Sequence, residues 1–198
     1  MIQAQLLTDQ LCTQGYHIIE DFLAPKDYQA LRTHIQELAQ QGQLRSAKIG
    51  QKLAAHRNDA IRTDSISWLD ENSPNSTIQL YLKKITELAK TLNQSLFLNL
   101  SEFETHFAAY QPGSYYKKHV DQFANNKDRK ISFVYYLNSD WQEDFGGQLK
   151  LYDADDQLLT QVLPQPNRFI CFKSELPHEV CLTQQSRYSI AGWLKSRS

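Results

Sequence analysis

Cysteine is scarce in this chain, and its spacing argues against two ways of stabilising a small fold. The 198 residues contain three cysteines, Cys12, Cys171 and Cys181, an odd number without a CxxC spacing. Disulfide frameworks pair an even number of cysteines, and structural zinc sites hold thiolates at short, fixed spacings. We therefore expect reduced cysteines that are buried or half-buried.

The chain also lacks an excess of charge of either sign and any long hydrophobic run. Its 21 lysines and arginines nearly balance 22 aspartates and glutamates, for a formal net charge of −1. Nucleic-acid binding through counterion release needs a strong positive field, which this balance does not provide. No segment reaches the ~18 apolar residues of a membrane span, and the start, MIQAQLLTDQLC, has no basic leader. We expect no nucleic-acid partner, no membrane segment and a cytoplasmic location.

Length and composition fit a single globular domain over residues 1–198. The chain is 41% hydrophobic and 22% charged, and a domain of this length buries roughly 70% of its unfolded surface. The sequence shows no internal repeat and no low-complexity linker. A metal or a disulfide is therefore not needed merely to hold the fold.

The first half, about residues 1–96, carries helical periodicity. In PKDYQALRTHIQELAQQG the apolar residues recur every three or four positions, Pro25 suits a helix start, and Gly42 suits a helix end. After Pro74 a second apolar stripe follows, formed by Ile78, Leu82, Ile85, Ala89 and Leu92. We expect two helices that pack against a sheet.

From about residue 97 to 198 the pattern changes to short segments rich in aromatic and β-branched residues. Turn signals separate them, and each is four to eight residues long, as in the strands of a sandwich or barrel. The predicted strands are ISFVYYLN, GQLKLYD, NRFICFK and RYSIAGWL. The fold is thus expected to be mainly β with N-terminal helices.

Between the two helices lies a local positive segment. From Arg45 to Arg62 it holds five basic residues and one acidic residue, Asp59. A solvated hairpin or loop explains such a segment as well as an arm that holds a partner does.

The stretch YYKKHVDQF raises the question of a metal site. In an extended segment His119 and Asp121 point to the same side and can reach one ion, although an HxD triplet alone is weak evidence. A second histidine, His178 in ELPHEV, and Arg187 in QSRYSIAGW follow later in the chain. Two imidazoles and one carboxylate on one face of an octahedron suit a non-haem Fe(II) oxygenase. Zinc accepts the same ligands, but a zinc site would give the guanidinium of Arg187, whose paired N–H groups suit a carboxylate, no obvious role.

These motifs, in this order, give the chain a resemblance to a known family. It resembles the 2-oxoglutarate- and Fe(II)-dependent prolyl 4-hydroxylases, and within them the oxygen-sensing prolyl hydroxylase domains of animals and their bacterial relatives. The similarity runs over GYHIIEDFL, IRTDSISWLDE, HVDQ, YYLNSDW, FGGQLKLY, PHEV and RYSIAGW. It implies a double-stranded β-helix, or jelly roll, backed by the N-terminal helices.

The resemblance implies roles for individual residues. His119, Asp121 and His178 would bind the iron, and Arg187 would pair with the far carboxylate of 2-oxoglutarate. The hydroxyl of Tyr110 would bond that same carboxylate. The walls of the co-substrate pocket would be Val134, Tyr136 and Leu149.

The resemblance also implies substrate contacts. Trp193 matches a tryptophan beside the iron where the target proline lies. Arg62 and Asp64 fall where a mobile loop meets the target peptide, and Arg129 falls where a partner for Asp64 is expected. The basic segment from Arg45 to Arg62 would then cover the substrate.

The expected function is hydroxylation of a prolyl residue in a protein, with Fe(II), 2-oxoglutarate and O₂ as cofactors, ascorbate as a stimulant, and release of succinate and CO₂. Elongation factor Tu is the leading candidate substrate, on resemblance to bacterial members. A hydroxylase of a free amino acid or another small molecule is one alternative. A non-catalytic metal-binding jelly roll is the other.

Overall fold

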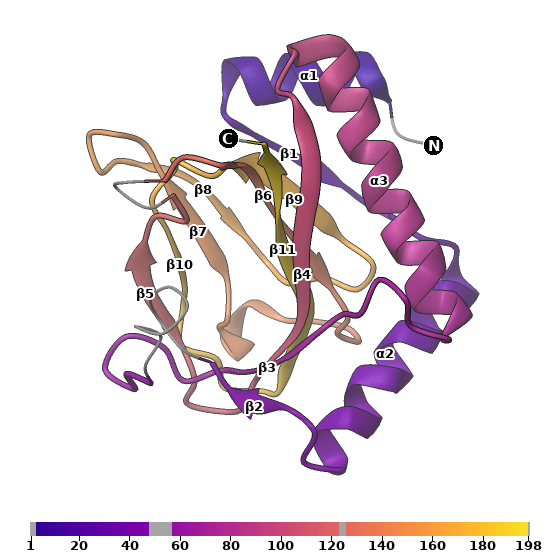
Figure 1. Cartoon of the computed structure of the whole chain (residues 1–198). Helices are drawn as coiled ribbons and strands as arrows, with labels where there is room; N and C mark the ends of the chain where they lie inside the picture. The colour runs from indigo at the N-terminus through magenta and orange to yellow at the C-terminus, as the bar shows by residue number, and fades with distance from the viewer. Residues whose placement is uncertain (1–2, 48–56, 123–125, 198) are drawn as a thin grey trace.

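The structure is a computed structural model that describes residues 3–47, 57–122 and 126–197. Two antiparallel sheets face each other, and three helices from the first half of the chain lie against the outer face of the larger sheet (Figure 1). This arrangement is mainly β with N-terminal helices, as predicted. Of the helices described, none combines the length and the apolar character that crossing a bilayer requires.

The larger sheet holds seven of the described strands and the smaller sheet four. The larger sheet runs in the order β1 (Tyr16–Ile19), β9 (Phe169–Lys173), β6 (Arg129–Tyr136), β11 (Arg187–Ser196), β4 (Leu100–Tyr110), β3 (Ser65–Trp68) and β2 (Arg45–Ser46). The smaller sheet runs in the order β5 (Tyr116–His119), β10 (His178–Val180), β7 (Leu149–Tyr152) and β8 (Leu158–Val162). A 3-10 turn, η2 (Glu143–Phe145), precedes β7.

The two predicted helices are present, the first with the expected start and end and the second with the expected start. Helix α2 (Pro25–Gln40) has proline in its first turn and is followed by Gly42 with φ of +66°. Helix α3 (Ser76–Leu96) begins after Asn75, whose side chain accepts hydrogen bonds from two backbone N–H groups of the first turn. Four of the five stripe residues of α3 are fully buried, and Ala89 is half-buried.

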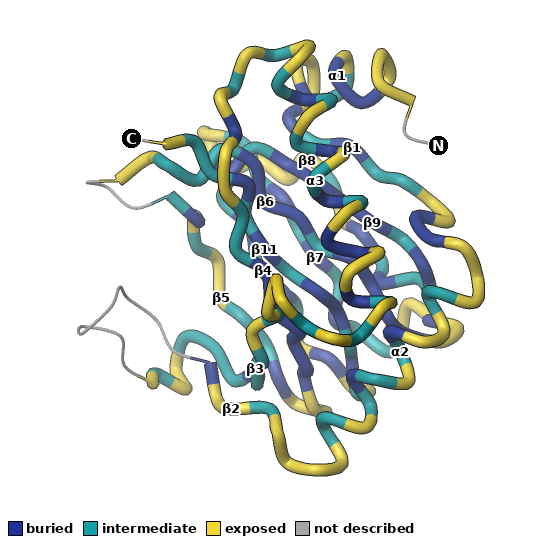
Figure 2. Tube along the Cα trace, turned by 45° about the vertical axis from the view of Figure 1, so that its right-hand side comes forward, coloured by how far each residue is buried: buried dark blue, intermediate teal, exposed yellow. Residues whose placement is uncertain are grey.

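Alternation along the strands of the larger sheet divides its side chains between two cores. On β6, Phe133 and Tyr135 face the helices, whereas Val134 and Tyr136 face the smaller sheet. Buried positions accordingly run along the central strands β6, β9 and β11 (Figure 2). The face turned toward the smaller sheet is the one that carries the polar residues of the site.

Two elements at the start of the chain were not predicted. Helix α1 (Ala4–Thr13) buries only Leu7, Thr8 and Leu11, and no side chain caps its first turn. Strand β1 has four residues and pairs with β9 from the far end of the chain. Both elements depend on partners that are distant in sequence, which local periodicity does not reveal.

Candidate active site

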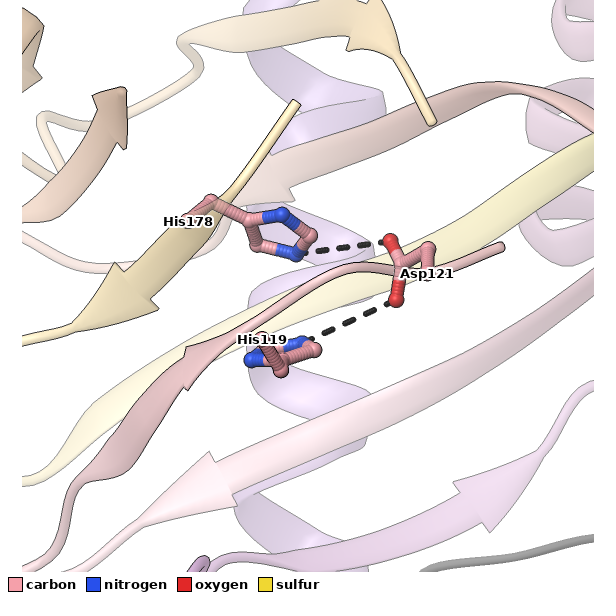
Figure 3. Close-up of side chains that lie close together, drawn as sticks. All are labelled: His119, Asp121 and His178. Carbon is pink, nitrogen blue, oxygen red and sulfur yellow. Dashed lines mark ion pairs between the residues drawn. The ribbon is translucent and has the colours of Figure 1, made fainter. Parts of the chain in front are cut away.

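The chain brings His119, Asp121 and His178 together between the two sheets. His119 ends β5, Asp121 follows two residues later, and His178 opens β10 directly opposite His119 in the strand pairing. The Nε2 atom of His119 lies 3.6 Å from one carboxylate oxygen of Asp121, and Nε2 of His178 lies 3.4 Å from the other. Both rings point at that carboxylate (Figure 3). One donor atom from each residue lies within 4.8 Å of the other two.

Each histidine is held in the form that leaves Nε2 free to bind a metal. Nδ1 of His119 lies 2.8 Å from the carbonyl oxygen of Lys117, and Nδ1 of His178 lies 2.9 Å from that of Leu176. Because a carbonyl only accepts, each Nδ1 carries the proton and donates it. Nε2, the ring atom that lies toward Asp121, is then the atom that would bind a metal, as in metal-bound histidines that donate to a backbone carbonyl.

Asp121 is ionised although it is buried. Burial opposes the charge, but His178 and His119 together hold the pKa of Asp121 well below its usual range. Its second carboxylate oxygen accepts a hydrogen bond of 2.7 Å from the Ser132 hydroxyl. The Ser174 hydroxyl lies 2.9 Å from Ser132, so the pair continues the hydrogen-bonded chain away from the cavity.

Arg187, the first residue of β11, is buried with part of its guanidinium unused. It is 1% exposed, its Nε donates to the carbonyl of Gly147 at 2.9 Å, and its Nη1 lies 3.3 Å from the Ser189 hydroxyl. Its Nη2 is buried and has no hydrogen-bond partner among the described residues. A Cβ on Gly147 would lie 3.1 Å from the Arg187 side chain, so glycine leaves the space that this arginine occupies.

Two tyrosines flank this guanidinium and supply hydroxyl groups. Arg187 Cζ lies 4.9 Å from the ring centroid of Tyr110 and 5.1 Å from that of Tyr136. The Tyr136 hydroxyl is also buried without a partner in the described part of the chain. Burial raises the pKa of both tyrosines, so both hydroxyls stay protonated and can donate. Buried donors without a partner are costly, and a bound carboxylate would satisfy them.

One cavity connects these groups. Its walls include His119, Asp121 and His178, and also Arg187 and Tyr110. The predicted wall residues Val134 and Leu149 line it, and so does Trp193, whereas Tyr136, the third predicted wall residue, is not among the lining residues. The donor set fits a divalent metal with open positions, and Nη2 of Arg187, which has no partner among the described residues, fits the far carboxylate of a dicarboxylate.

The predicted pair of Asp64 with Arg129 is wrong, because each residue has a nearer partner. Asp64 accepts two hydrogen bonds from Arg62, at 2.7 and 2.6 Å, and the pair is almost fully buried. Arg129 lies 3.3 Å from Glu104, with its guanidinium carbon 3.6 Å from the Trp193 ring centroid. The central part of the basic segment, residues 48–56, lies outside the described residues.

Several side chains at the cavity escaped the sequence analysis. Ser132 lies on the same face of β6 as Val134 and Tyr136, so strand parity alone would have identified it. Tyr116 lies on β5 three residues before His119, and His106 on β4 lies between Trp68 and Trp193. Trp68 stands in the motif IRTDSISWLDE but was given no role there, and His106 stands in no motif; the pairing of β3 with β4 brings the two together.

Comparison with known proteins places the chain among oxygenases. Residues 105–195 match the model of the 2OG-Fe(II) oxygenase superfamily. Human Egl nine homolog 1 is 27% identical over 186 residues, which cover 90% of this chain and 43% of the human protein. The rat protein of the same name is 54% covered, so the chain spans about half the length of these curated relatives.

Two solved structures are similar over nearly the whole chain. A Trichoplax adhaerens prolyl hydroxylase, in complex with a hypoxia inducible factor oxygen degradation domain peptide fragment, is 27% identical with a TM-score of 0.85, covering 98% of this chain and 89% of that one. A Pseudomonas putida prolyl-4-hydroxylase is 34% identical with a TM-score of 0.88, covering 99% of this chain and 100% of that one. This similarity confirms the jelly-roll oxygenase fold. The chain therefore belongs to the 2OG-Fe(II) oxygenase superfamily, whose cofactors are Fe(II), 2-oxoglutarate and dioxygen.

Proposed function

We propose that this protein hydroxylates a prolyl residue of a protein substrate. One observation carries the proposal: the cavity lined by the His119–Asp121–His178 cluster is also lined by Arg187, whose Nη2 is buried without a partner among the described residues. A metal centre alone needs no such donor at a distance. A dicarboxylate co-substrate needs the metal at one end and a hydrogen-bond donor for its far carboxylate at the other. Similarity to the two prolyl hydroxylase structures supports the choice of reaction.

Different residues would bind the metal, bind 2-oxoglutarate and exclude water. His119, Asp121 and His178 would hold Fe(II) on one face, and Arg187, Tyr136 and Tyr110 would hold the far carboxylate of 2-oxoglutarate. Bound iron, with 2-oxoglutarate and O₂, supplies the oxidation: one oxygen atom enters a prolyl C–H bond, and the other enters the succinate formed with CO₂. The apolar walls at Val134 and Leu149 keep water from the reacting centre.

Aromatic side chains at the cavity support a prolyl substrate. The Trp193 ring lies at the cavity with the Arg129 guanidinium against it, which fixes the plane of the ring. Trp68 is 56% exposed, and its ring centroid lies 6.4 Å from that of Trp193. Flat aromatic faces pack well against a pyrrolidine ring, and an exposed tryptophan gives a protein chain a surface to contact.

The test is a reaction of the protein with Fe(II), 2-oxoglutarate, ascorbate and air, with elongation factor Tu as the candidate substrate. We expect mass spectrometry to find one added oxygen on a proline, together with succinate, and neither product with the His178→Ala variant. Succinate without modification would remove elongation factor Tu as the substrate. Hydroxylation of free proline at a similar rate would favour the small-molecule alternative. Absence of both products in iron-loaded protein would favour a metal-binding module.

A further inference from the structure

Residues 59–64, which begin in the basic segment and run up to β3, lie along the strand that carries His119. Lys117 N donates to the Ile61 carbonyl at 2.9 Å, and Thr63 N donates to the Tyr115 carbonyl at 3.1 Å. Arg62 forms an antiparallel bridge with Tyr116 between these bonds. On its other edge β5 pairs with β10, so His119 belongs to a strand held from both sides.

Side chains extend this pairing as a stack that ends at His119. The Arg62 guanidinium carbon lies 4.2 Å from the Tyr116 ring centroid. The Tyr116 and His119 rings are stacked, with centroids 3.6 Å apart and planes 14° apart. Arg62, Tyr116 and His119 therefore form a three-layer stack in the wall of the cavity.

The guanidinium of Arg62 is fixed differently from that of Arg187. Asp64 accepts from both Nε and Nη2 of Arg62, and the two side chains are 0% and 10% exposed respectively. The planar fork is thus held edge-on by Asp64 while its flat face covers Tyr116. This geometry suits a support for the tyrosine better than a contact that binds substrate.

We propose that Arg62 and Tyr116 are positioning residues that fix the imidazole of His119 for metal binding. The Lys117 carbonyl holds only one edge of the ring, at Nδ1, and leaves the ring free to swing about that bond. The stack supplies the second restraint, against the face of the ring, so that Nε2 stays directed at Asp121. Residues 59–64 are thereby coupled to the metal site. The inference rests on the proposed function only for the identity of the metal.

Mn(II) binding to the metal-free protein, followed by electron paramagnetic resonance of the free ion, tests this without turnover. We expect Tyr116→Leu to weaken Mn(II) affinity roughly 10- to 100-fold, the range for residues that orient metal ligands. Tyr116→Phe keeps the aromatic face and should retain affinity within roughly 3-fold. Arg62→Lys keeps the charge beside Asp64 but loses the flat face, and should lose roughly 3- to 10-fold.

A double variant tests whether the two residues act as one unit. In Tyr116→Leu protein, the further change Arg62→Lys should cost little, because the layer through which Arg62 acts is gone. Arg57 is the matched control, since its pair with Asp59 lies in the same segment but is exposed, at 61% and 55%. Arg57→Ala should bind Mn(II) as wild type does.

The readouts separate positioning from folding and from the proposed reaction. Thermal melting of the metal-free variants shows whether each is folded. If Tyr116→Leu does not fold, the Mn(II) affinity of Tyr116→Phe still tests the stack. Wild-type affinity in Tyr116→Leu, a loss in Tyr116→Phe as large as in Tyr116→Leu, or losses that add in the double variant would overturn the proposal. If the affinities change as expected but no succinate forms with wild-type protein, the proposed function fails and this inference stands.

Discussion

The guanidinium of Arg187 has a donor that no described residue satisfies. Nε and Nη1 have partners, Gly147 and Ser189, while Nη2 is buried without one among the described residues. A charged bidentate contact to a carboxylate is worth about 1.5–3 kcal/mol per hydrogen bond. Arg187→Lys keeps the charge but loses the fork, and should raise the KM for 2-oxoglutarate roughly 10- to 100-fold in a succinate-release assay. An unchanged KM would remove Arg187 from the co-substrate site.

Tyr136 provides the matched comparison for that measurement. Its hydroxyl, near the Arg187 guanidinium, is likewise buried without a partner in the described part of the chain, but it is neutral. Tyr136→Phe removes one neutral hydrogen bond, worth about 0.5–1.5 kcal/mol, so the KM should rise roughly 2- to 10-fold. We expect the larger rise in KM for the Arg187 variant because the hydrogen bond from Arg187 is charged, whereas that from Tyr136 is neutral.

His106 makes folding sensitive to acid. Burial, with the positive charge of Arg62, lowers the pKa of His106 to about 4, whereas an unfolded histidine titrates near 6.5. Between these values the unfolded chain binds the extra proton, so stability is full above pH 6.5 and is lost as the pH falls toward 4. At pH 4.5 the loss is about 2 to 3 kcal/mol.

Urea unfolding of metal-free protein at pH 7 and pH 4.5 measures this loss. His106→Gln cannot take up the proton and should lose about 2 to 3 kcal/mol less between the two pH values than wild type does. Subtracting the two proteins cancels the contributions of the other histidines. Equal losses in both would show that His106 is protonated in the folded protein as readily as in the unfolded one.

At the scale of single elements, strand β11 contributes side chains to the core and to the site, and Gly192 allows it to pack closely between β4 and β6. A Cβ at Gly192 would lie 2.3 Å from the Glu104 carbonyl oxygen and 2.5 Å from the Phe133 ring, so the strand would have to move. Gly192→Ala should destabilise the protein by roughly 3 kcal/mol, the upper end for overpacking. The measurement is urea unfolding.

Gly113 is the control for that substitution. A Cβ there meets nothing within 4 Å, but the φ of +87° disfavours alanine. Gly113→Ala should therefore cost about 1 kcal/mol from backbone strain alone. If both substitutions cost the same, close packing of β11 against β4 and β6 is not what requires glycine at position 192.

Local patterns predicted some elements well and others not at all. Helices α2 and α3 each carry an apolar stripe and a start signal, and α2 also has a stop signal at Gly42, so the sequence near each predicts a helix; the end of α3 at Phe97 carries no such signal. Strand β4, at 11 residues, was not predicted. Exposure does not alternate along its first five residues, and its last six residues are all buried, so it lacks the alternating pattern of a half-buried strand. The placement of His119 and His178 was expected from motif order, whereas the partner of Asp64 depends on the path of a loop that no pattern specifies.

At the scale of the whole molecule, the two ends of the site belong to different sheets. His119 and His178 lie on β5 and β10 of the smaller sheet, whereas Arg187 lies on β11 of the larger one. A bound metal therefore strengthens the smaller sheet and the loop at Asp121. A dicarboxylate that reaches from the metal to Arg187 ties the two sheets together.

Thermal unfolding separates these two effects. A ligand at 100 times its Kd stabilises the folded state by about 2.7 kcal/mol, so Mn(II) should raise the Tm, and 2-oxoglutarate added to the Mn(II) form should raise it again by a comparable amount. Arg187→Lys should keep the first increment and lose most of the second at the same concentrations, since only the contact on the larger sheet is weakened. A full second increment in that variant would mean that 2-oxoglutarate does not span the sheets through Arg187. Loss of the first would mean that Arg187 supports the metal ligands themselves.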